Sequence, residues 1–224
     1  EMEQKQWAVW WRFRKWHGIH SGMWCGWFGG RLIASINQKK PPFWRINIPM
    51  KQVMFSAHHL NIESVKFYYD RLKESKIKWL HGYPSQIAEF AHLCKEKNFN
   101  DFSNIAYITT GSENLLEHQK EIIEEVFQVN VIEHYGLAEG VSNISQHNDG
   151  FFKADQDFAY TEFIPVNDSD PSICKIIGTN YHNSSFPLIR YDTGDLAKIE
   201  WYDDSKYAIQ SIDGRNEDYI KLID

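Results

Sequence analysis

The chain has 224 residues, of which 42% are hydrophobic and 15% aromatic, and its formal net charge is −6. This composition is typical of a globular protein with a substantial core and excludes a disordered chain. The longest weakly polar run, Gly22 to Gly30, is far shorter than the roughly 20 residues that a membrane-spanning helix needs. The chain opens without a secretory signal pattern, so no membrane partner is expected.

The three cysteines predict neither a disulfide framework nor a zinc site. Cys25, Cys94 and Cys174 are far apart and show no C-x-x-C spacing. His147 also stands near no cysteine in the sequence, so zinc is not expected as a cofactor. A reducing, cytoplasmic location is the one that fits this cysteine usage best.

The first 50 residues are basic although the whole chain is acidic. They hold eight Lys or Arg against two Glu, a balance of +6, and they are rich in tryptophan. Interleaved aromatic and basic residues can bind single-stranded nucleic acid. The same pattern is also that of a helix that buries its aromatic face and exposes its charged one, and this second interpretation is favoured. Residues 1–17 are therefore predicted to form a helix that ends at Gly18, and no nucleic-acid partner is expected.

From residue 61 onward, helices and strands are predicted to alternate. Asn61 is a candidate N-cap for a helix whose apolar residues recur at helical spacing. Pro84 suits the first position of a second helix, and a third is predicted over 115–127. The intervening strands are predicted at 77–80, 105–109 and 129–134.

Strands joined by helices of this length imply right-handed crossovers and a parallel sheet. The carboxyl ends of the strands then lie along one edge, where open α/β sheets place their ligands. That edge would collect Tyr83, the segment Gly111 to Glu113 and the segment Tyr135 to Glu139.

After Gly150 the pattern changes to short strands and turns, with strands predicted at 158–164 and 173–181. Residues 150–212 are therefore predicted to form a small β-rich, barrel-like subdomain. The predicted fold class is α/β, with a parallel-sheet part over residues 1–149, the β-rich subdomain, and a final motif over residues 213–224.

Three stretches in this order resemble the signature motifs of the adenylate-forming enzymes, the superfamily of acyl- and aryl-coenzyme A ligases. They are YGLAE at 135–139, RYDTGD at 190–195 and DGRNEDYIK at 213–221. The stretches HGYPSQIAEFA and TTGSENL resemble, more narrowly, the phenylacetate–coenzyme A ligase branch and the capsular polysaccharide biosynthesis proteins beside it. The resemblance covers nearly the whole chain and implies part of the large N-terminal, AMP-binding domain of these enzymes.

The resemblance implies an ATP-dependent ligase that activates a small carboxylate as an acyl adenylate. Coenzyme A, an amine or a sugar-linked group would then accept the acyl group. Asp195 would bind the ribose hydroxyls, and Arg215 the ribose and the α-phosphate. Glu139 would ligate Mg²⁺, so that Glu139 and Arg215 are the catalytic candidates.

Further residues are assigned to the nucleotide and acyl pockets by the same resemblance. Tyr83, Gly111 and Gly136 would line the acyl pocket, and Glu217 would act as the hinge of a C-terminal lid. The remaining nucleotide-binding candidates, besides Asp195, Arg215, Gly111 and Gly136, are Ser112, Glu113, Glu133 and Tyr135.

The sequence also departs from the family pattern. The phosphate-binding loop expected upstream of the first helix and the lid with its lysine expected after Asp224 are both absent, so the segment alone is expected to catalyse poorly. Ala138 stands where the family often has a hydroxyl residue. Two alternatives therefore stay open, a catalytically silent nucleotide-binding or capsule-assembly protein on the same fold, and nucleic-acid binding through the first helix.

Overall fold

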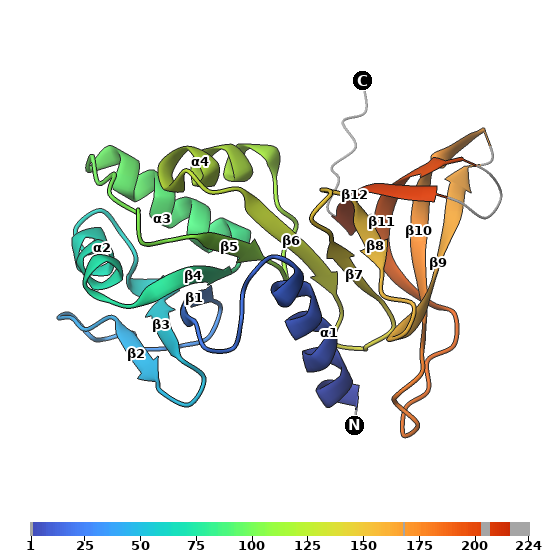
Figure 1. Ribbon diagram of the computed structural model, residues 1–224, viewed down its shortest axis with the longest axis horizontal. Helices are drawn as coiled ribbons and strands as arrows, with labels where there is room; N and C mark the ends of the chain where they lie inside the picture. The colour runs from blue at the N-terminus through green and yellow to red at the C-terminus, as the bar shows by residue number, and fades with distance from the viewer. Residues whose placement is uncertain (1, 168, 203–206, 216–224) are drawn as a thin grey trace. The chain divides into compact units, whose positions relative to one another are not determined.

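The computed structural model describes residues 2–167, 169–202 and 207–215 (Figure 1). The chain divides into two compact units. Residues 19–133 form one, here called the α/β unit, and residues 1–18 with 134–224 form the other, here called the β-rich unit. This division differs from the predicted boundary between residues 149 and 150, because the first helix and residues 134–149 belong with the later strands.

The α/β unit is built on a sheet with the strand order β2-β3-β1-β4-β5-β6. All neighbouring strands in it are parallel except β2 and β3, so the predicted parallel sheet is confirmed. The strands are β1 (Trp24–Gly29), β2 (Trp44–Asn47), β3 (Gln52–Ser56), β4 (Ile77–Gly82), β5 (Tyr107–Thr110) and the start of β6 (Val131–Gly136). The first three of these strands were not predicted.

The helices that connect these strands are α2 (Val65–Glu74), α3 (Pro84–Glu96) and α4 (Glu117–Phe127), and a 3-10 turn, η1 (Ala57–His59), precedes them. Pro84 opens α3 as predicted. Asn61 does not cap α2, which begins four residues later. Its side-chain oxygen instead accepts hydrogen bonds from the backbone N–H groups of Glu63 and Ser64, both at 3.0 Å, and turns the chain into the helix.

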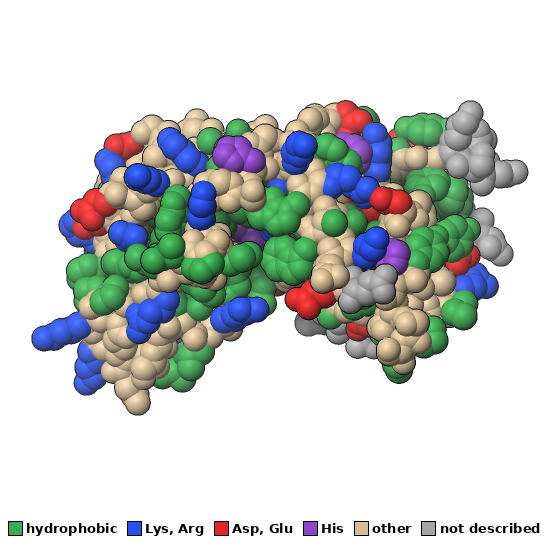
Figure 2. Space-filling view, turned by 60° about the horizontal axis from the view of Figure 1, so that its bottom comes forward, with side chains coloured by type: hydrophobic (Ala, Val, Ile, Leu, Met, Phe, Trp, Pro, Cys, Tyr) green, Lys and Arg blue, Asp and Glu red, His purple; other side chains and the backbone are tan. Residues whose placement is uncertain are grey.

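One apolar cluster forms the core of the α/β unit. Its helical members, such as Leu72, Ile87 and Ile123, are fully buried against strand residues such as Leu80 and Ile108. Helical periodicity explains why these residues share a face. Other hydrophobic side chains stay on the surface of the protein, where they lie beside Lys and Arg side chains (Figure 2).

The β-rich unit is antiparallel throughout, with the strand order β6-β7-β8-β12-β11-β10-β9. The predicted β-rich character is confirmed. The strands, besides the end of β6, are β7 (Asn143–Gln146), β8 (Phe152–Ala154), β9 (Ala159–Asn167), β10 (Asp170–Asn180), β11 (Tyr191–Trp201) and β12 (Tyr207–Arg215). Ile144, Cys174, Ile176 and Ile199 lie at the centre of its apolar core.

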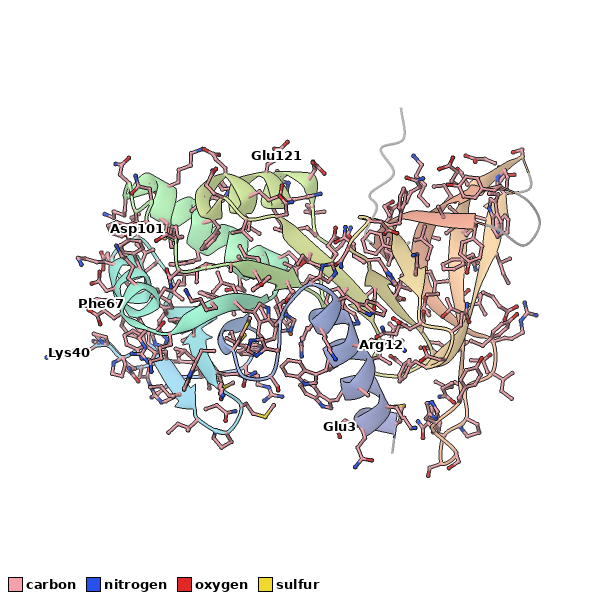
Figure 3. The ribbon with its side chains drawn as sticks, in the orientation of Figure 1. Glu3, Arg12, Lys40, Phe67, Asp101 and Glu121 are labelled. Carbon is pink, nitrogen blue, oxygen red and sulfur yellow. The ribbon has the colours of Figure 1, made fainter. Side chains whose placement is uncertain are left out.

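Helix α1 (Met2–Trp16) belongs to the β-rich unit. It packs Val9 against Phe158 and Ala159, and it places Arg12 next to the start of β9 (Figure 3). Within the described parts of the chain, every helix is too short or too polar to cross a bilayer.

Candidate functional site

In the α/β unit the carboxyl ends of β1, β4 and β5 are fixed side by side, as predicted for β4 and β5, whereas β1 was not predicted. The backbone N–H of Tyr83 donates to the carbonyl of Phe28 at 2.8 Å, and the N–H of Gly111 donates to the carbonyl of Gly82 at 3.3 Å. A Cβ atom on Gly82 would lie 1.7 Å from the Phe28 carbonyl oxygen. Only glycine permits this approach, so Gly82 sets the spacing of the strand ends that carry Tyr83 and Gly111.

The predicted segment Gly111 to Glu113 forms a tight connection after β5. Ser112 adopts a left-handed backbone conformation with φ of 69°. The Glu113 carboxylate accepts a hydrogen bond of 3.3 Å from the backbone N–H of Ser85, in the first turn of α3. Helix N-termini favour negative charge, so this contact holds Glu113 next to Tyr83.

Glu133 is the last residue of the α/β unit and lies opposite Thr110, the residue before Gly111. Its side chain is half-buried. Burial raises the pKa of the Glu133 carboxyl group, and the nearby charge of Lys120 opposes that rise. The structure therefore places Glu133 at the same strand edge as Gly111.

In the β-rich unit, the first two motifs are joined by a hydrogen bond. The Tyr135 hydroxyl donates to Oδ2 of Asp195 at 2.6 Å, across 60 positions of sequence. Asp195 is only 6% exposed. Burial and the Asp195 carboxylate both raise the pKa of the Tyr135 hydroxyl, which keeps it protonated as a donor.

The RYDTGD motif contains a bulge at the start of β11. Ile177 lies opposite Asp192 and Lys175 opposite Leu196, which leaves residues 193–195 facing Ile176 alone. Gly194 takes a φ of 77°, a conformation that side chains disfavour. Asp195 lies on the buried face of β11, in alternation with Thr193 and Ala197.

Hydrogen bonds within the motif hold the bulge in place. The Thr193 hydroxyl donates to the Ile176 carbonyl at 2.9 Å and accepts from the Asp195 N–H at 3.1 Å. The Gly194 N–H donates to Oδ1 of Asp192 at 3.0 Å. The position of Asp195 is therefore set by the whole motif.

The third motif begins beside the second. In the pairing of β11 with β12, Arg215 lies opposite Asp195. This register brings the backbones of two predicted nucleotide-binding residues together. The side chain of Arg215 and the predicted hinge residue Glu217 lie outside the described part of the structure.

Glu139 lies on a turn that follows β6 and is fixed from two sides. The Gly140 N–H donates to the Leu137 carbonyl at 3.1 Å, and Gln6 of α1 donates to the same carbonyl at 3.0 Å. The side-chain amide of Asn180 reaches the Glu139 carbonyl at 3.4 Å. Ala138, beside it, is exposed.

The Glu139 side chain suits one part of the predicted magnesium site. It is half-buried, and no described residue donates a hydrogen bond to its carboxylate. Magnesium is commonly held by one or two carboxylates together with substrate phosphates. Among described residues, no three His, Cys, Asp or Glu side chains gather closely enough to hold a metal by themselves. The donor set therefore fits a metal that arrives with phosphate groups.

Gly136, a predicted pocket residue, faces the N-terminal helix within the β-rich unit. A Cβ atom on Gly136 would lie 3.1 Å from Oδ1 of Asn143 and 3.7 Å from Nε1 of Trp10. These two atoms are themselves hydrogen-bonded at 3.2 Å. Gly136 therefore lets α1 come close to the end of β6.

The sequence gave no indication of a buried polar network centred on Asn143 and Asp155, which are 0% and 6% exposed. Asn143 accepts from His134 at 2.9 Å and donates to Asp155 at 2.6 Å, and Ser145 also donates to Asp155 at 2.7 Å. Arg12 closes the network through a 2.6 Å ion pair with Asp155. The network ties α1 to the strand that follows the Glu139 turn.

The comparisons with known proteins agree with these motifs. No family model matches the chain. The protein CapK of Staphylococcus aureus is 31% identical over 215 residues, which are 93% of this chain and 47% of CapK. A structure of 2-hydroxyisobutyryl-CoA ligase with 2-HIB-AMP in the postadenylation state superposes with a TM-score of 0.65 at 17% identity, covering 94% of this chain and 47% of the ligase.

A second structure of that ligase, in an open conformation with 2-HIB-AMP and CoA, gives a TM-score of 0.58 at 17% identity over 94% of this chain and 52% of the ligase. The chain has the fold of the adenylate-forming CoA ligases. The predicted resemblance and fold class are thereby confirmed. The chain spans about half the length of CapK and of this ligase.

Proposed function

We propose that the chain is the AMP-binding core of an ATP-dependent ligase that activates a carboxylate as an acyl adenylate. The acyl group then passes to coenzyme A or to another acceptor. The observation that carries the proposal is the convergence of Tyr135, Asp195 and Arg215, through a 2.6 Å hydrogen bond and a strand register. The fold and the similarity to CapK support it.

Asp195 would recognise the ribose of the nucleotide. Tyr135 engages its Oδ2 atom, and no described residue donates to Oδ1, which remains for a ribose hydroxyl. A hydrogen bond from a hydroxyl to a carboxylate contributes about 1.5–3 kcal/mol. Because Asp195 is almost buried, little water competes for that contact.

Arg215 and Glu139 would help to neutralise the negative charge of the ATP phosphates. Attack of one anion on a polyanion needs neutralisation and fixed geometry, since both reactants repel each other. Arg215 would supply cationic donors to the α-phosphate. Glu139 would hold Mg²⁺, which when bound neutralises phosphate oxygens. The hydrogen bonds of the turn fix the backbone at Glu139.

The remaining pocket assignments rest on the sequence motifs. Tyr83, Gly111 and Gly136 are assigned to the acyl pocket, and Ser112, Glu113 and Glu133 to the nucleotide pocket. Three buried, free cysteines support a reducing, cytoplasmic location.

Exchange of pyrophosphate into ATP, measured with a panel of carboxylic acids on the protein as its gene encodes it, tests the proposal. Asp195→Asn is expected to reduce exchange at least tenfold, about 1.4 kcal/mol or more, because it removes the charge that strengthens the ribose contact. Asp149→Asn is the matched control. It changes a surface carboxylate of the same unit outside the three motifs, paired with Lys153 at 3.4 Å, and exchange should persist. Absence of pyrophosphate exchange with every acid tested would refute the proposal that the protein is a ligase.

A catalytically silent nucleotide-binding protein on the same fold is the second candidate. It is favoured by Ala138, which offers no hydroxyl beside Glu139. Titration calorimetry that shows AMP or ATP binding without pyrophosphate exchange would select it. Restoration of exchange by Ala138→Thr would identify the missing hydroxyl as the cause.

Nucleic-acid binding through α1 receives no support from the geometry. Arg12 is paired with Asp155 and Asp157, and Arg14 is buried within 5.0 Å of the Trp11 ring centroid. These two cations are therefore used inside the β-rich unit, and the favoured prediction of a packed helix agrees with this arrangement.

A further inference from the structure

The hairpin formed by β2 and β3 carries exposed aliphatic side chains at its tip. β2 is the edge strand of the α/β sheet, and the turn between the strands runs from Ile48 to Lys51. Ile48 is 71% exposed, Ile46 50% and Met50 48%. Single exposed aliphatic residues are ordinary, but several on one projecting turn indicate an apolar partner.

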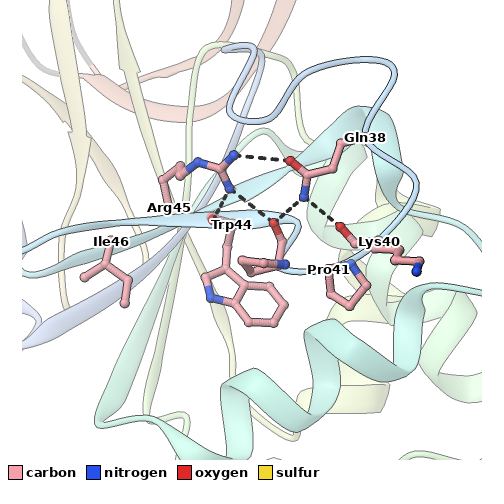
Figure 4. Close-up of a pocket in the computed structure, with 7 residues that line it drawn as sticks. Gln38, Lys40, Pro41, Trp44, Arg45 and Ile46 are labelled. Atoms are coloured by element: carbon pink, nitrogen blue, oxygen red, sulfur yellow. Dashed lines mark hydrogen bonds between the residues drawn. The ribbon is translucent and has the colours of Figure 1, made fainter.

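A shallow groove of about 640 Å³ lies next to this strand (Figure 4). It is lined by Gln38, Lys40, Pro41, Pro42, Trp44, Arg45 and Ile46. Gln38 donates to the carbonyls of Lys40 and Pro42, both at 2.8 Å, and Arg45 of β2 donates to the Pro42 carbonyl and to Oε1 of Gln38, both at 3.2 Å. These bonds fix the loop against the strand as one surface.

We call this surface the hairpin patch and define it as the groove residues Lys40, Pro41, Pro42, Trp44, Arg45 and Ile46 with the tip residues Ile48, Pro49 and Met50. Its charge is of one sign. The chain from residue 19 to residue 62 contains five Lys or Arg and neither Asp nor Glu. Lys39, Lys40 and Arg45 are exposed there, and Figure 2 shows cationic side chains beside hydrophobic ones on this unit.

Three kinds of partner could meet such a patch, and its chemistry favours one. A second copy docked through the same patch would set like charges against each other. Single-stranded RNA is bound through aromatic stacking, whereas the exposed tip is aliphatic. An anionic lipid surface accepts aliphatic side chains below its headgroups and cations among them, so it satisfies both features at once.

We propose that the hairpin patch docks the protein on the surface of an anionic lipid bilayer, which departs from the sequence-based expectation of no membrane partner. Ile48 and Met50 enter the boundary between headgroups and acyl chains, and Lys39, Lys40 and Arg45 lie at the level of the lipid phosphates. The proposal does not rest on the ligase activity, because it concerns a different surface.

Co-sedimentation with vesicles tests the proposal. The protein should pellet with vesicles of phosphatidylcholine mixed with phosphatidylglycerol, should pellet far less with phosphatidylcholine alone, and should be released as salt is raised. Lys40→Gln should weaken binding about fivefold. Ile48→Ser with Met50→Ser should reduce it further. Val166→Ser is the matched control, because Val166 is 52% exposed on β9 in the other unit and should leave binding unchanged.

Four outcomes would overturn the proposal. The first is that the protein does not bind anionic vesicles, and the second is that it binds them but the hairpin variants do not change the binding. The third is that the protein forms a dimer in solution that Ile48→Ser dissociates. The fourth is binding that disappears when the chain is joined to further polypeptide of its gene, since that polypeptide would then cover the patch. Circular dichroism of each variant separates loss of binding from loss of fold.

Discussion

The two units are stabilised internally by different kinds of contact. The α/β unit packs three helices on its sheet through one apolar cluster. In the β-rich unit, α1 is attached to β7 and to the start of β9 largely by polar groups, with Asn143 and Asp155 buried between them. Apolar packing tolerates small changes of shape, whereas a buried polar network fails when one partner is lost. The β-rich unit is therefore expected to be the more sensitive to single polar substitutions.

The largest effect is expected for Asp155→Ala. It leaves Arg12, Asn143 and Ser145 without a shared acceptor in a buried site. A buried donor left without its acceptor costs about 1–3 kcal/mol of unfolding free energy, and Asn143 and Ser145 lose theirs together. Hydrogen exchange measured on peptides from α1 and β7 should rise accordingly, while peptides from α3 should change little.

Asp157→Ala provides the comparison for that variant. Asp157 also pairs with Arg12, but its side chain is 64% exposed. Exposed ion pairs contribute under about 1 kcal/mol, so this variant should be almost neutral. Equal effects of the two substitutions would show that burial of Asp155 is unimportant and that the network is not the attachment of α1.

The α/β unit should be most sensitive to loss of apolar volume. Ile87 is fully buried in its core, and Ile87→Ala is expected to cost about 2–5 kcal/mol through lost transfer energy and a cavity. Hydrogen exchange in peptides from α3 and α4 measures the effect. Ile36→Ala, at a position 58% exposed, should change stability by less than about 0.5 kcal/mol.

The same contrast explains which parts of the fold could be predicted from sequence. Helices α2, α3 and α4 carry apolar residues at helical spacing within a few turns, so their existence was predictable and only their ends were displaced. β1 was missed because its sequence, WCGWFG, is buried on both faces and shows no alternation. β11 was missed because Asp192, Thr193 and Gly194 have the composition of a turn, although they form a bulge in a strand.

The residues of the candidate site also divide into those that the sequence indicated and those that it did not. The motifs that carry Tyr135, Asp195 and Arg215 could be recognised from sequence, and the structure brings these three residues together, while their roles stay predictions. Asn143 and Asp155 gave no signal because each is a single polar residue. Their importance depends on partners more than 130 positions away, such as Trp10 and Arg12, and no local pattern encodes that pairing.

Lowering the pH is expected to have an intermediate effect on the stability of the β-rich unit, through protonation of His134. Burial among Trp10 and Phe13 lowers the pKa of His134 from 6.5 to about 4, with Asn143 opposing the shift and the charge of Arg14 adding to it. The unfolded chain binds the proton more readily than the folded one, so stability is full above pH 6.5 and falls as the pH drops toward 4. The loss attributable to His134 is about 3 kcal/mol.

Urea unfolding from pH 7 to pH 4 measures this dependence. The curve of unfolding free energy against pH should be flatter for His134→Gln than for the wild type in that interval. His92→Gln, at an exposed position on α3, should give the wild-type curve. A His134→Gln curve that runs parallel to the wild type would mean that burial does not keep the imidazole neutral. The β-rich unit would then owe its acid sensitivity to its carboxylates alone.

Apart from the control variants, the smallest effect is expected for Tyr135→Phe, which removes the hydrogen bond to Asp195 and keeps the ring. A hydrogen bond to a charged group contributes about 1.5–3 kcal/mol. Tyr160→Phe, on a residue 50% exposed, controls for loss of a hydroxyl. Titration calorimetry with AMP distinguishes two roles. If the Tyr135 hydroxyl only stabilises the fold, the affinity for AMP survives the change. If the hydroxyl orients Asp195 toward the ribose, the affinity for AMP falls along with stability. The polar contacts of the β-rich unit then serve binding as well as folding.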